Sequence, residues 1–551
     1  MLCIKSAIIS DGAFPELARV DHLSIENTII PPTAFPQLAT VHANNTPYRS
    51  LHIKASLISD AAFPALRLAG NVLIENTTIP SRAFPELTRV ASLHLSGTTL
   101  GENAFRNLAT VDGAFEASGV RLPTGTPRKL SHIGGLGING AIIEESCFNM
   151  ISNIQYLNAT DATIRPNTFA ALSRISNATI KGVRLPEGAF PVLETAAGLN
   201  AANAIIPSSA FPALTGVDTR TNGRGGLCVN NATIVEGAFP ALTNVSHLDA
   251  ENTAVPSTAF PVLARIGSFG GGRLNINTSN ILEGAFPALA SVDNLVANGA
   301  TISSTSFPAL TSIGSRNSGT LNIKEAMISE GAFPVLTGLA FLNAENANIS
   351  SRAFPMTSSI HHLFIGGATL SKSIFNETNR IDDLHAENAT IETNQFQAVV
   401  SIGTLIIYSG KILPFAFPAL TNISFLHATG AVVSEDAFPM LGSAVDLNIQ
   451  SSTISHRAFP SLVNVEGTIN ASSAVILDNA FPVLSHIGGY LNDSSSDGGF
   501  PTLGNVKRGT QFADDEDDCH DPWAMAPWHQ DSGMCEECRD TGSCLGDCGR
   551  W

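Results

Sequence analysis

Phenylalanine returns at a fixed interval along almost the whole chain, and this period constrains the fold more than any other feature. The clearest run is Phe354, Phe375, Phe396, Phe417, Phe438 and Phe459, whose members are 21 residues apart. A period of this size is typical of stacked repeats, in which one unit cannot bury its apolar side alone and must pack on its neighbours. The sequence therefore predicts a solenoid rather than a chain of separate globular domains.

Composition limits the class of protein and of partner. The 551 residues carry a formal net charge of -17, with 14% charged and 44% hydrophobic residues. An acidic chain is a poor partner for nucleic acid or for an anionic membrane, which attract clustered Lys and Arg. No apolar run reaches the ~18–20 residues that a membrane-spanning helix needs. We therefore expect no nucleic-acid partner and no transmembrane segment in this chain.

The repeat unit alternates in the way a half-buried strand does. We number the unit from Val90 as position 1, which places Leu93 at position 4, Leu95 at position 6 and Phe105 at position 16. Apolar residues at positions 4 and 6 flank a polar position 5, the period-2 pattern of a strand. Stacked units should pair these strands in parallel, each residue above its equivalent in the next unit.

Two further parts of the unit predict where the chain turns. Position 8 is mostly Asn or Gly, as at Asn76, Gly97 and Asn388, and these residues tolerate left-handed backbone angles. The Ala-Phe-Pro-x-Leu stretch favours a short turn or 3₁₀ segment, because proline disfavours helical angles at the residue before it. We therefore expect a mostly β, right-handed solenoid with a parallel sheet on one side, short turns on the other and a buried Phe column.

The solenoid should occupy residues 1–505, followed by an acidic linker at 506–518 and a cysteine-rich tail at 519–551. Two units separate Phe105 from Phe148, with Thr126-Pro127 standing where Phe-Pro is expected. The first residues, Leu2 to Ile9, already fit the strand register, and no signal peptide precedes them. We interpret the N-terminus as incomplete, and the tail as possibly truncated.

At this point the unit resembles the leucine-rich repeats. Leu87, Val90, Leu93, Leu95, Thr98 and Leu100 follow the core pattern of that family, and Ala104, Phe105 and Leu108 are similar to its BspA-like variety. The resemblance implies a solenoid with a parallel sheet, used in adhesion or ligand recognition. The family's usual Asn position is Thr98, Thr253, Ala300 or Ala389 here, and the unit is short. A β-helical coil similar to receptor L domains therefore stays open.

Two sets of residues are candidate binding sites. Position 5 should point outward from the sheet, and its row of polar residues could hydrogen-bond a ligand or merely stack without binding anything. Four longer units insert residues between positions 1 and 4, and each insertion carries an arginine that could reach a ligand or be neutral variation. The row candidates are His94, Asn200, Asp249, Asn275, Asn322, Asn343, His385, His427 and Asn448; the edge-loop candidates are Arg49, Arg224, Arg273 and Arg316.

Cysteines divide into two groups. Cys3, Cys147 and Cys228 stand alone in the repeats and are expected to be buried thiols. The tail cysteines suit disulfides in an oxidising compartment, with a zinc site as the alternative. Together with frequent Asn-x-Ser/Thr sequons, they favour an extracellular or cell-surface glycoprotein. The disulfide candidates are Cys519, Cys535, Cys538, Cys544 and Cys548.

No catalytic, cofactor or metal motif accompanies these features. Scattered histidines lack the spacing of a metal site, and Asp249 lacks the acidic neighbours that a polysaccharide-cleaving β-helix needs. We expect a non-enzymatic recognition or adhesion scaffold that binds a glycan, peptide or protein on the sheet face or at the inserted loops. A structural stalk and, less favoured, a β-helical carbohydrate-active enzyme are the alternatives.

Overall fold

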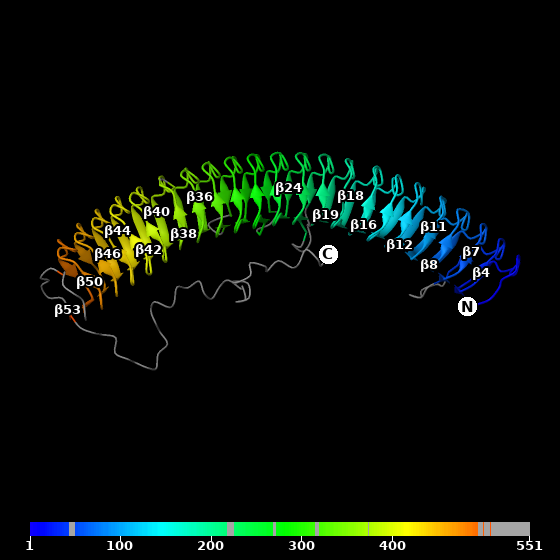
Figure 1. The fold of residues 1–551 in the computed structure, drawn as a ribbon, viewed down its shortest axis with the longest axis horizontal. Coiled ribbons are helices and arrows are strands. Elements are labelled where there is room, and N and C mark those ends of the chain that lie inside the picture. Colours follow the sequence, from blue (N-terminus) through cyan, green and yellow to red (C-terminus); the bar gives the residue numbers. More distant parts are fainter. Residues whose placement is uncertain are drawn as a thin grey trace, which may run out of the picture. The chain divides into compact units, whose positions relative to one another are not determined.

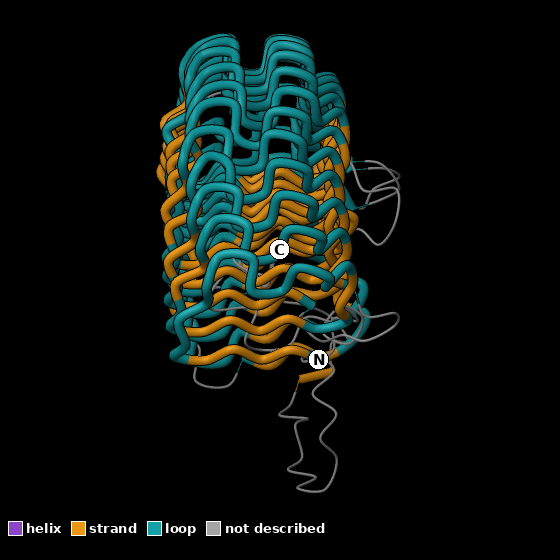
Figure 2. Tube along the Cα trace, turned by 90° about the vertical axis from the view of Figure 1, so that its right-hand side faces the viewer, coloured by secondary structure: helices purple, strands orange, loops and turns teal. Residues whose placement is uncertain are grey.

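The computed structural model describes residues 1–42, 50–217, 225–267, 271–314, 319–372, 374–493, 500 and 507–508. They form a parallel β-solenoid of about 22 turns, which confirms the fold class that the phenylalanine period predicts. Strands and loops recur at the same places in successive coils, and no helix is drawn among these residues (Figure 2). Consequently, this part of the chain contains no helix long and apolar enough to cross a membrane.

The chain divides into two compact units, residues 1–343 with 347–357 and residues 344–346 with 358–551. In the first unit the main sheet pairs Leu93 with Val72 and Leu95 with Ile74, so equivalent positions lie above one another (Figure 1). Its strands include β1 (Leu2–Lys5), β3 (Leu23–Glu26), β6 (Leu51–Lys54), β8 (Leu68–Glu75), β10 (Arg89–Ser96), β12 (Thr110–Glu116), β14 (His132–Gly137), β16 (Asn153–Asn158), β18 (Arg174–Thr179), β19 (Thr195–Asn200), β22 (Leu227–Cys228), β25 (His247–Asp249), β28 (Arg273–Asn275), β31 (Asn294–Val296), β34 (Thr320–Asn322) and β36 (Gly338–Asn343).

The second unit repeats this arrangement. Leu384 of one strand pairs with Leu405 of the next, and Leu405 pairs with Leu426. The main strands are β38 (Ser359–Phe364), β40 (Arg380–His385), β42 (Ser401–Ile406), β44 (Asn422–His427), β46 (Ser443–Asn448), β49 (Ile469–Asn470), β52 (Tyr490–Asn492) and β53 (Lys507–Arg508). The pairing of β53 with β52 reaches slightly past the expected boundary at residue 505; the remaining linker and the tail at 519–551 lie outside the described residues.

Most coils also carry a second, two-residue strand that the sequence pattern did not lead us to expect. In β11 (Thr99–Leu100), Leu100 points into the core and Thr99 outward, and the strand pairs with β9 (Thr78–Ile79). Equivalent strands continue through β20 (Ile205–Ile206) and β23 (Thr233–Ile234) in the first unit, and through β41 (Thr390–Ile391) and β43 (Lys411–Ile412) in the second. Two residues are too few for a period-2 signal.

Left-handed backbone angles mark two corners of the coil. At position 8 the φ values are 58° for Gly97, 51° for Asn252 and 54° for Asn388, which confirms the predicted corner. A second left-handed residue lies two positions before the phenylalanine, as at Asn103 with φ 62°. The sequence hides this corner because Arg457 and even Phe415 occupy it elsewhere, with φ values of 52° and 56°. Both types are unusual at positive φ.

The phenylalanines form stacked columns inside each unit. Ring centroids from Phe148 to Phe354 lie 5.2–5.9 Å apart, and those from Phe375 to Phe500 lie 4.9–5.6 Å apart, with nearly parallel planes. Position 17 usually holds the proline that follows each ring. Apolar residues at positions 1, 4, 6, 11, 15 and 19 fill the rest of the core, and Val90, Leu93 and Leu108 are fully buried. The predicted buried column is therefore present.

One coil of the first unit lacks its phenylalanine and replaces it from the opposite side. Thr126 and Pro127, joined by a cis peptide bond, occupy the Ala-Phe place, one residue earlier than the Phe-Pro place that the sequence suggests, because the Thr126 N–H bonds the Pro123 carbonyl as the Ala104 N–H bonds that of Gly101. Phe115, at the sheet position that is usually leucine, is fully buried and meets Phe148 edge to face at 5.8 Å. The ring volume missing from the turn side is thus supplied by the strand.

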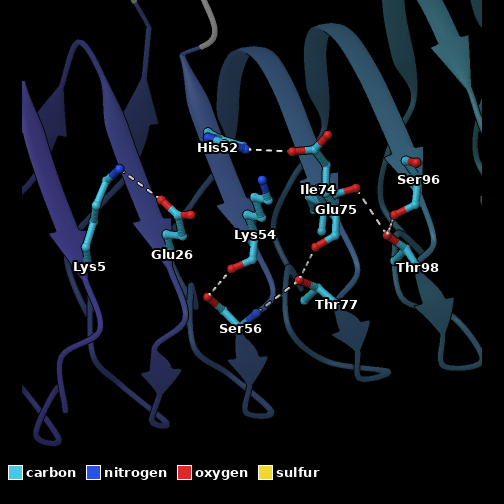
Figure 3. Close-up of polar contacts among 10 residues, drawn as sticks. All are labelled: Lys5, Glu26, His52, Lys54, Ser56, Ile74, Glu75, Thr77, Ser96 and Thr98. Carbon is cyan, nitrogen blue, oxygen red and sulfur yellow. Dashed lines mark hydrogen bonds and ion pairs between the residues drawn. The ribbon is translucent and has the colours of Figure 1, made fainter.

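Hydroxyl groups secure the position-9 corner in several coils where the leucine-rich repeats would have an asparagine (Figure 3). Ser56 donates from its hydroxyl to the Lys54 carbonyl at 2.8 Å and accepts from the Thr28 backbone N–H at 3.2 Å. Thr98 donates to the Ser96 and Ile74 carbonyls. Where alanine stands at position 9, as at Ala141, its N–H instead bonds the position-6 carbonyl of the same coil, at 3.1 Å.

Replacing one ring of the column tests its contribution to stability. Phe239→Ala should lower the free energy of unfolding by about 3–5 kcal/mol, because a cavity replaces a buried ring, and Phe239→Leu should cost less. Val192→Ala is the matched control, since Val192 is 41% exposed. Denaturant unfolding followed by circular dichroism measures the difference. Equal stability of Phe239→Ala and Val192→Ala would contradict a packed column.

Candidate functional site

The position-5 residues do align in one row, as the period predicts. In the first unit Asn158, Thr179, Asn200, Cys228, Asp249 and Asn275 follow one another from strand to strand, and Asn322 pairs with Asn343. His94 continues the same row beside Leu73 and Glu116. In the second unit His385, Ile406, His427, Asn448 and Asn470 are aligned in the same way.

The row is less exposed than the sequence suggests. Asn200, Asn275 and His427 are only 3%, 4% and 9% exposed, so the expectation of an exposed row is wrong at these positions. Residues in a stacked parallel sheet are covered by their own neighbours above and below. The other candidates, including His94, Asn322 and Asn448, are half-buried. Outward direction in a solenoid strand does not mean free access to solvent.

Several of the asparagines cap the corner that follows them. The side-chain oxygen of Asn200 accepts the Ala202 N–H at 3.1 Å, and that of Asn448 accepts the Gln450 N–H at 3.3 Å. Asn322 makes the same contact with Lys324 at 3.4 Å. Such local side-chain bonds are a common use of asparagine at turns. This structural role explains the residue type without a ligand.

Asp249 lies within a local network. Its two carboxylate oxygens accept from Asn230 and Asn275, each at 3.0 Å. Burial lowers the pKa of the nearby Arg273, although Asp249 and Glu251 oppose that change. Both carboxylate oxygens of Asp249 are therefore hydrogen-bonded to neighbouring asparagines. A charge reversal at this residue would disturb the sheet as well as any ligand contact.

The second unit gathers a different set of residues on its sheet face, which we call the His–Asp patch: His361, His362, Phe364, Arg380, Asp382, Asp383 and His385. His361 contacts Asp382 at 2.5 Å and His362 contacts Asp383 at 2.8 Å, each through Nδ1. Arg380 also reaches Asp382, at 2.8 Å. The Phe364 and His385 rings stack at 4.3 Å. Only His385 of this set was predicted from the sequence.

Side chains in the patch are held but still reach solvent. The side chains of His361 and His362 are 35% and 33% exposed, and those of Asp382 and Asp383 are 32% and 19% exposed. Glu345 and Glu387 lie next to the patch, on either side of Gly366, and both come close to the place that a side chain there would fill. The patch and these two neighbours together hold four carboxylates and one guanidinium, beside the Phe364 and His385 rings.

Burial and charge act on the titration of the patch in opposite ways. Burial lowers the pKa of His385, and the carboxylates of Asp383 and Glu345 only partly offset this. For Asp382, burial alone would raise the pKa, but the hydrogen bonds and charges of His361 and Arg380 outweigh it and lower the pKa. At neutral pH the patch thus favours ionised Asp382 and neutral His385. Burial also lowers the pKa of His427, two strands further on.

The edge-loop candidates are mostly outside the structure's described ranges. Arg49, Arg224 and Arg316 lie at 43–49, 218–224 and 315–318, which are not described. Arg273 differs from expectation, because it begins strand β28 and pairs with His247 and Asn294 instead of lying in the loop. Its half-buried guanidinium faces the sheet row, so the inserted residues end before it.

The lone cysteines are not all buried. Cys147 and Cys228 are buried, but Cys3 is exposed, contrary to expectation: it lies on β1, which pairs with β3 alone, whereas Cys228 at the same position 5 is covered by a paired strand on either side. Cys147 lies at the inward position 15, and burial raises the pKa of its thiol to about 11. Cys519, Cys535, Cys538, Cys544 and Cys548 fall outside the described residues, so their disulfides stay a prediction. Within the described ranges, no three His, Cys, Asp or Glu residues lie where they could hold a metal ion.

Comparisons with known proteins add little to this geometry. No family model and no curated protein matches the chain. Among solved structures, CroV588, a novel circular LRR protein, is 15% identical over 92% of this chain and 85% of its own, with a TM-score of 0.31. The TLR13–ssRNA13 complex is also 15% identical, over 90% of this chain and 91% of its own, with a TM-score of 0.30.

The chain is thus similar to leucine-rich-repeat structures. The BspA-like variety stays a prediction. So does the absence of a nucleic-acid partner, which rests on charge alone.

The His385 environment predicts a pH dependence of stability. The unfolded state takes up a proton near the ordinary histidine pKa of about 6.5, before the folded state does, so stability should fall as the pH drops below that value. His385→Gln should make this decline shallower between pH 7.5 and 5, measured as the denaturant midpoint. His456→Gln, an exposed histidine on the turn side, is the control. A decline in His385→Gln as steep as in the wild type would contradict the assignment.

Proposed function

We propose that this protein is a non-enzymatic recognition scaffold that binds a basic polypeptide segment at the His–Asp patch of the second unit. The observation that carries the proposal is the Phe364–His385 ring stack, with the carboxylates of Asp383 and Glu345 near enough to act on the charge of His385. Asp382 and Glu387 add two more carboxylates on the same coils. Carboxylates and aromatic rings together suit Lys and Arg side chains, through ion pairs and cation–π contacts. The chain's net charge of -17 would also attract such a partner from solution.

The rigid stacking of coils supports this function. Asp382 is hydrogen-bonded by both His361 and Arg380, so this carboxylate is already oriented before a ligand arrives, and His362 lies 2.8 Å from Asp383. Pre-oriented groups lose less conformational entropy on binding. Neighbouring strands on either side offer further polar positions for an extended ligand. Extracellular or cell-surface location and adhesion belong to the same proposal and rest on the sequons and the tail cysteines.

The binding proposal can be tested with a peptide panel. Lys/Arg-containing peptides should bind, and Asp383→Asn or His385→Ala should weaken that binding by about tenfold, the loss of one charge-assisted or stacking contact. Glu435→Gln is the matched control, because Glu435 is an exposed carboxylate on the turn side of the same unit. Isothermal titration at two salt concentrations measures affinity, which should weaken as salt increases.

Other outcomes separate the competing functions. Binding of neutral glycans in preference to basic peptides would contradict the peptide ligand and favour the glycan alternative. Identical affinities for Asp383→Asn, His385→Ala and the control would remove the patch from the site. Failure of every ligand class to bind would favour a structural stalk. In that case, capping of the corners would be the whole role of the asparagines in the sheet row.

A further inference from the structure

A groove on the turn side of the first unit breaks the repeat pattern where three basic residues come together. Its volume is about 530 Å³, within the range of about 300–1,000 Å³ typical of ligand sites. Arg106, Arg128 and Lys129 line it, together with Asn103, Asn107 and Asn149. No Asp or Glu occurs among the described residues that line it. The lining of the groove is therefore positively charged, whereas the chain as a whole carries a net charge of -17.

The groove lies where the repeat loses its proline. Position 17 is proline in most units, as at Pro85 before the groove and Pro191 after it. In four consecutive units between them, the position holds Arg106, Arg128, Asn149 and Ala170. The same stretch contains the coil in which Thr126-Pro127 replaces Ala-Phe. The row of rigid pyrrolidine rings is therefore interrupted, and two of the four replacing side chains, Arg106 and Arg128, are long and end in hydrogen-bond donors.

Hydrogen bonds across coils shape the groove. Lys129 donates from Nζ to the side-chain oxygen of Asn107 at 2.8 Å. Asn107 in turn donates from Nδ2 to the Pro85 carbonyl at 2.7 Å, so it is fixed between two coils. Arg106 and Arg128 occupy the same position of adjacent coils and are exposed. Coils repeat at about 4.8 Å, so the two guanidinium groups project from neighbouring levels of one surface.

We propose that this groove binds a sulfated or carboxylated oligosaccharide. Guanidinium groups form paired hydrogen bonds with sulfate or carboxylate oxygens, and asparagine amides suit sugar hydroxyls. Met150 is the one apolar residue among those lining the groove, so the site lacks the hydrophobic pocket that usually anchors a peptide. The ligand class, the residues and the location all differ from those of the His–Asp patch, and the two sites can be tested independently.

Binding to a size-defined sulfated oligosaccharide tests the groove in the full chain. The triple variant Arg106→Ala, Arg128→Ala, Lys129→Ala should lower the affinity by about tenfold or more, because three charge-assisted contacts are lost together. The matched control removes three exposed arginines of the same unit outside the groove, by Arg82→Ala, Arg174→Ala and Arg184→Ala. This control should retain the wild-type affinity, because its three arginines lie outside the groove. It is matched because both variants remove three positive charges. Circular dichroism melting verifies that both variants are folded.

Two further measurements make the test specific. Arg106→Lys with Arg128→Lys should bind better than the alanine variant but less well than the wild type, because charge is kept while the paired hydrogen bonds are lost. The desulfated oligosaccharide should bind poorly. Equal affinities of the groove and control triple variants, no binding of the sulfated probe, or equally tight binding of polyglutamate would each overturn the proposal.

Discussion

The contact between one coil and the next determines every other property of this structure. Backbone groups on the strands pair in parallel, and the phenylalanine rings inside repeat the same spacing of about 5 Å from coil to coil. Burying one such ring contributes roughly 1.5–3 kcal/mol, so the column favours the register that the backbone pairing requires. Side chains at equivalent positions must then lie above one another. The rows on the sheet face and the groove on the turn side both follow from this constraint.

Much of this arrangement could be predicted because it repeats. Three features occur in many units: the Phe period, the alternation around His94 and the Asn/Gly position at Gly97. Because each is repeated, an exception in one unit does not hide the pattern. Features that occur once or are short were missed. The two-residue strand at Thr99–Leu100 carries no period, and Phe115 replaces a ring through a contact between distant sequence positions. The second left-handed corner was hidden because its residue types are mixed.

The candidate sites show why function is harder to predict than fold. Asparagines at position 5 align as expected, but Asn200 and Asn448 cap corners, a local task that composition cannot distinguish from ligand binding. The His–Asp patch depends on pairs such as His362 and Asp383, which lie in adjacent coils and have no signature in either coil alone. The basic groove, by contrast, is a departure from the repeat, since position 17 loses its proline there. In a regular solenoid, irregular coils are therefore the natural place to look for binding.

Deleting one coil tests the central claim most directly. Removal of Val400–Leu420 excises 21 residues and joins Val399 to Thr421 in the correct register. The account predicts a folded protein with retained β-sheet circular dichroism and cooperative unfolding, because each coil contacts only its neighbours. Removal of Val400–Gly410 alone shifts the register by about half a coil and should abolish folding of the second unit. Similar stability of the two deletions would contradict a fold built on coil-to-coil stacking.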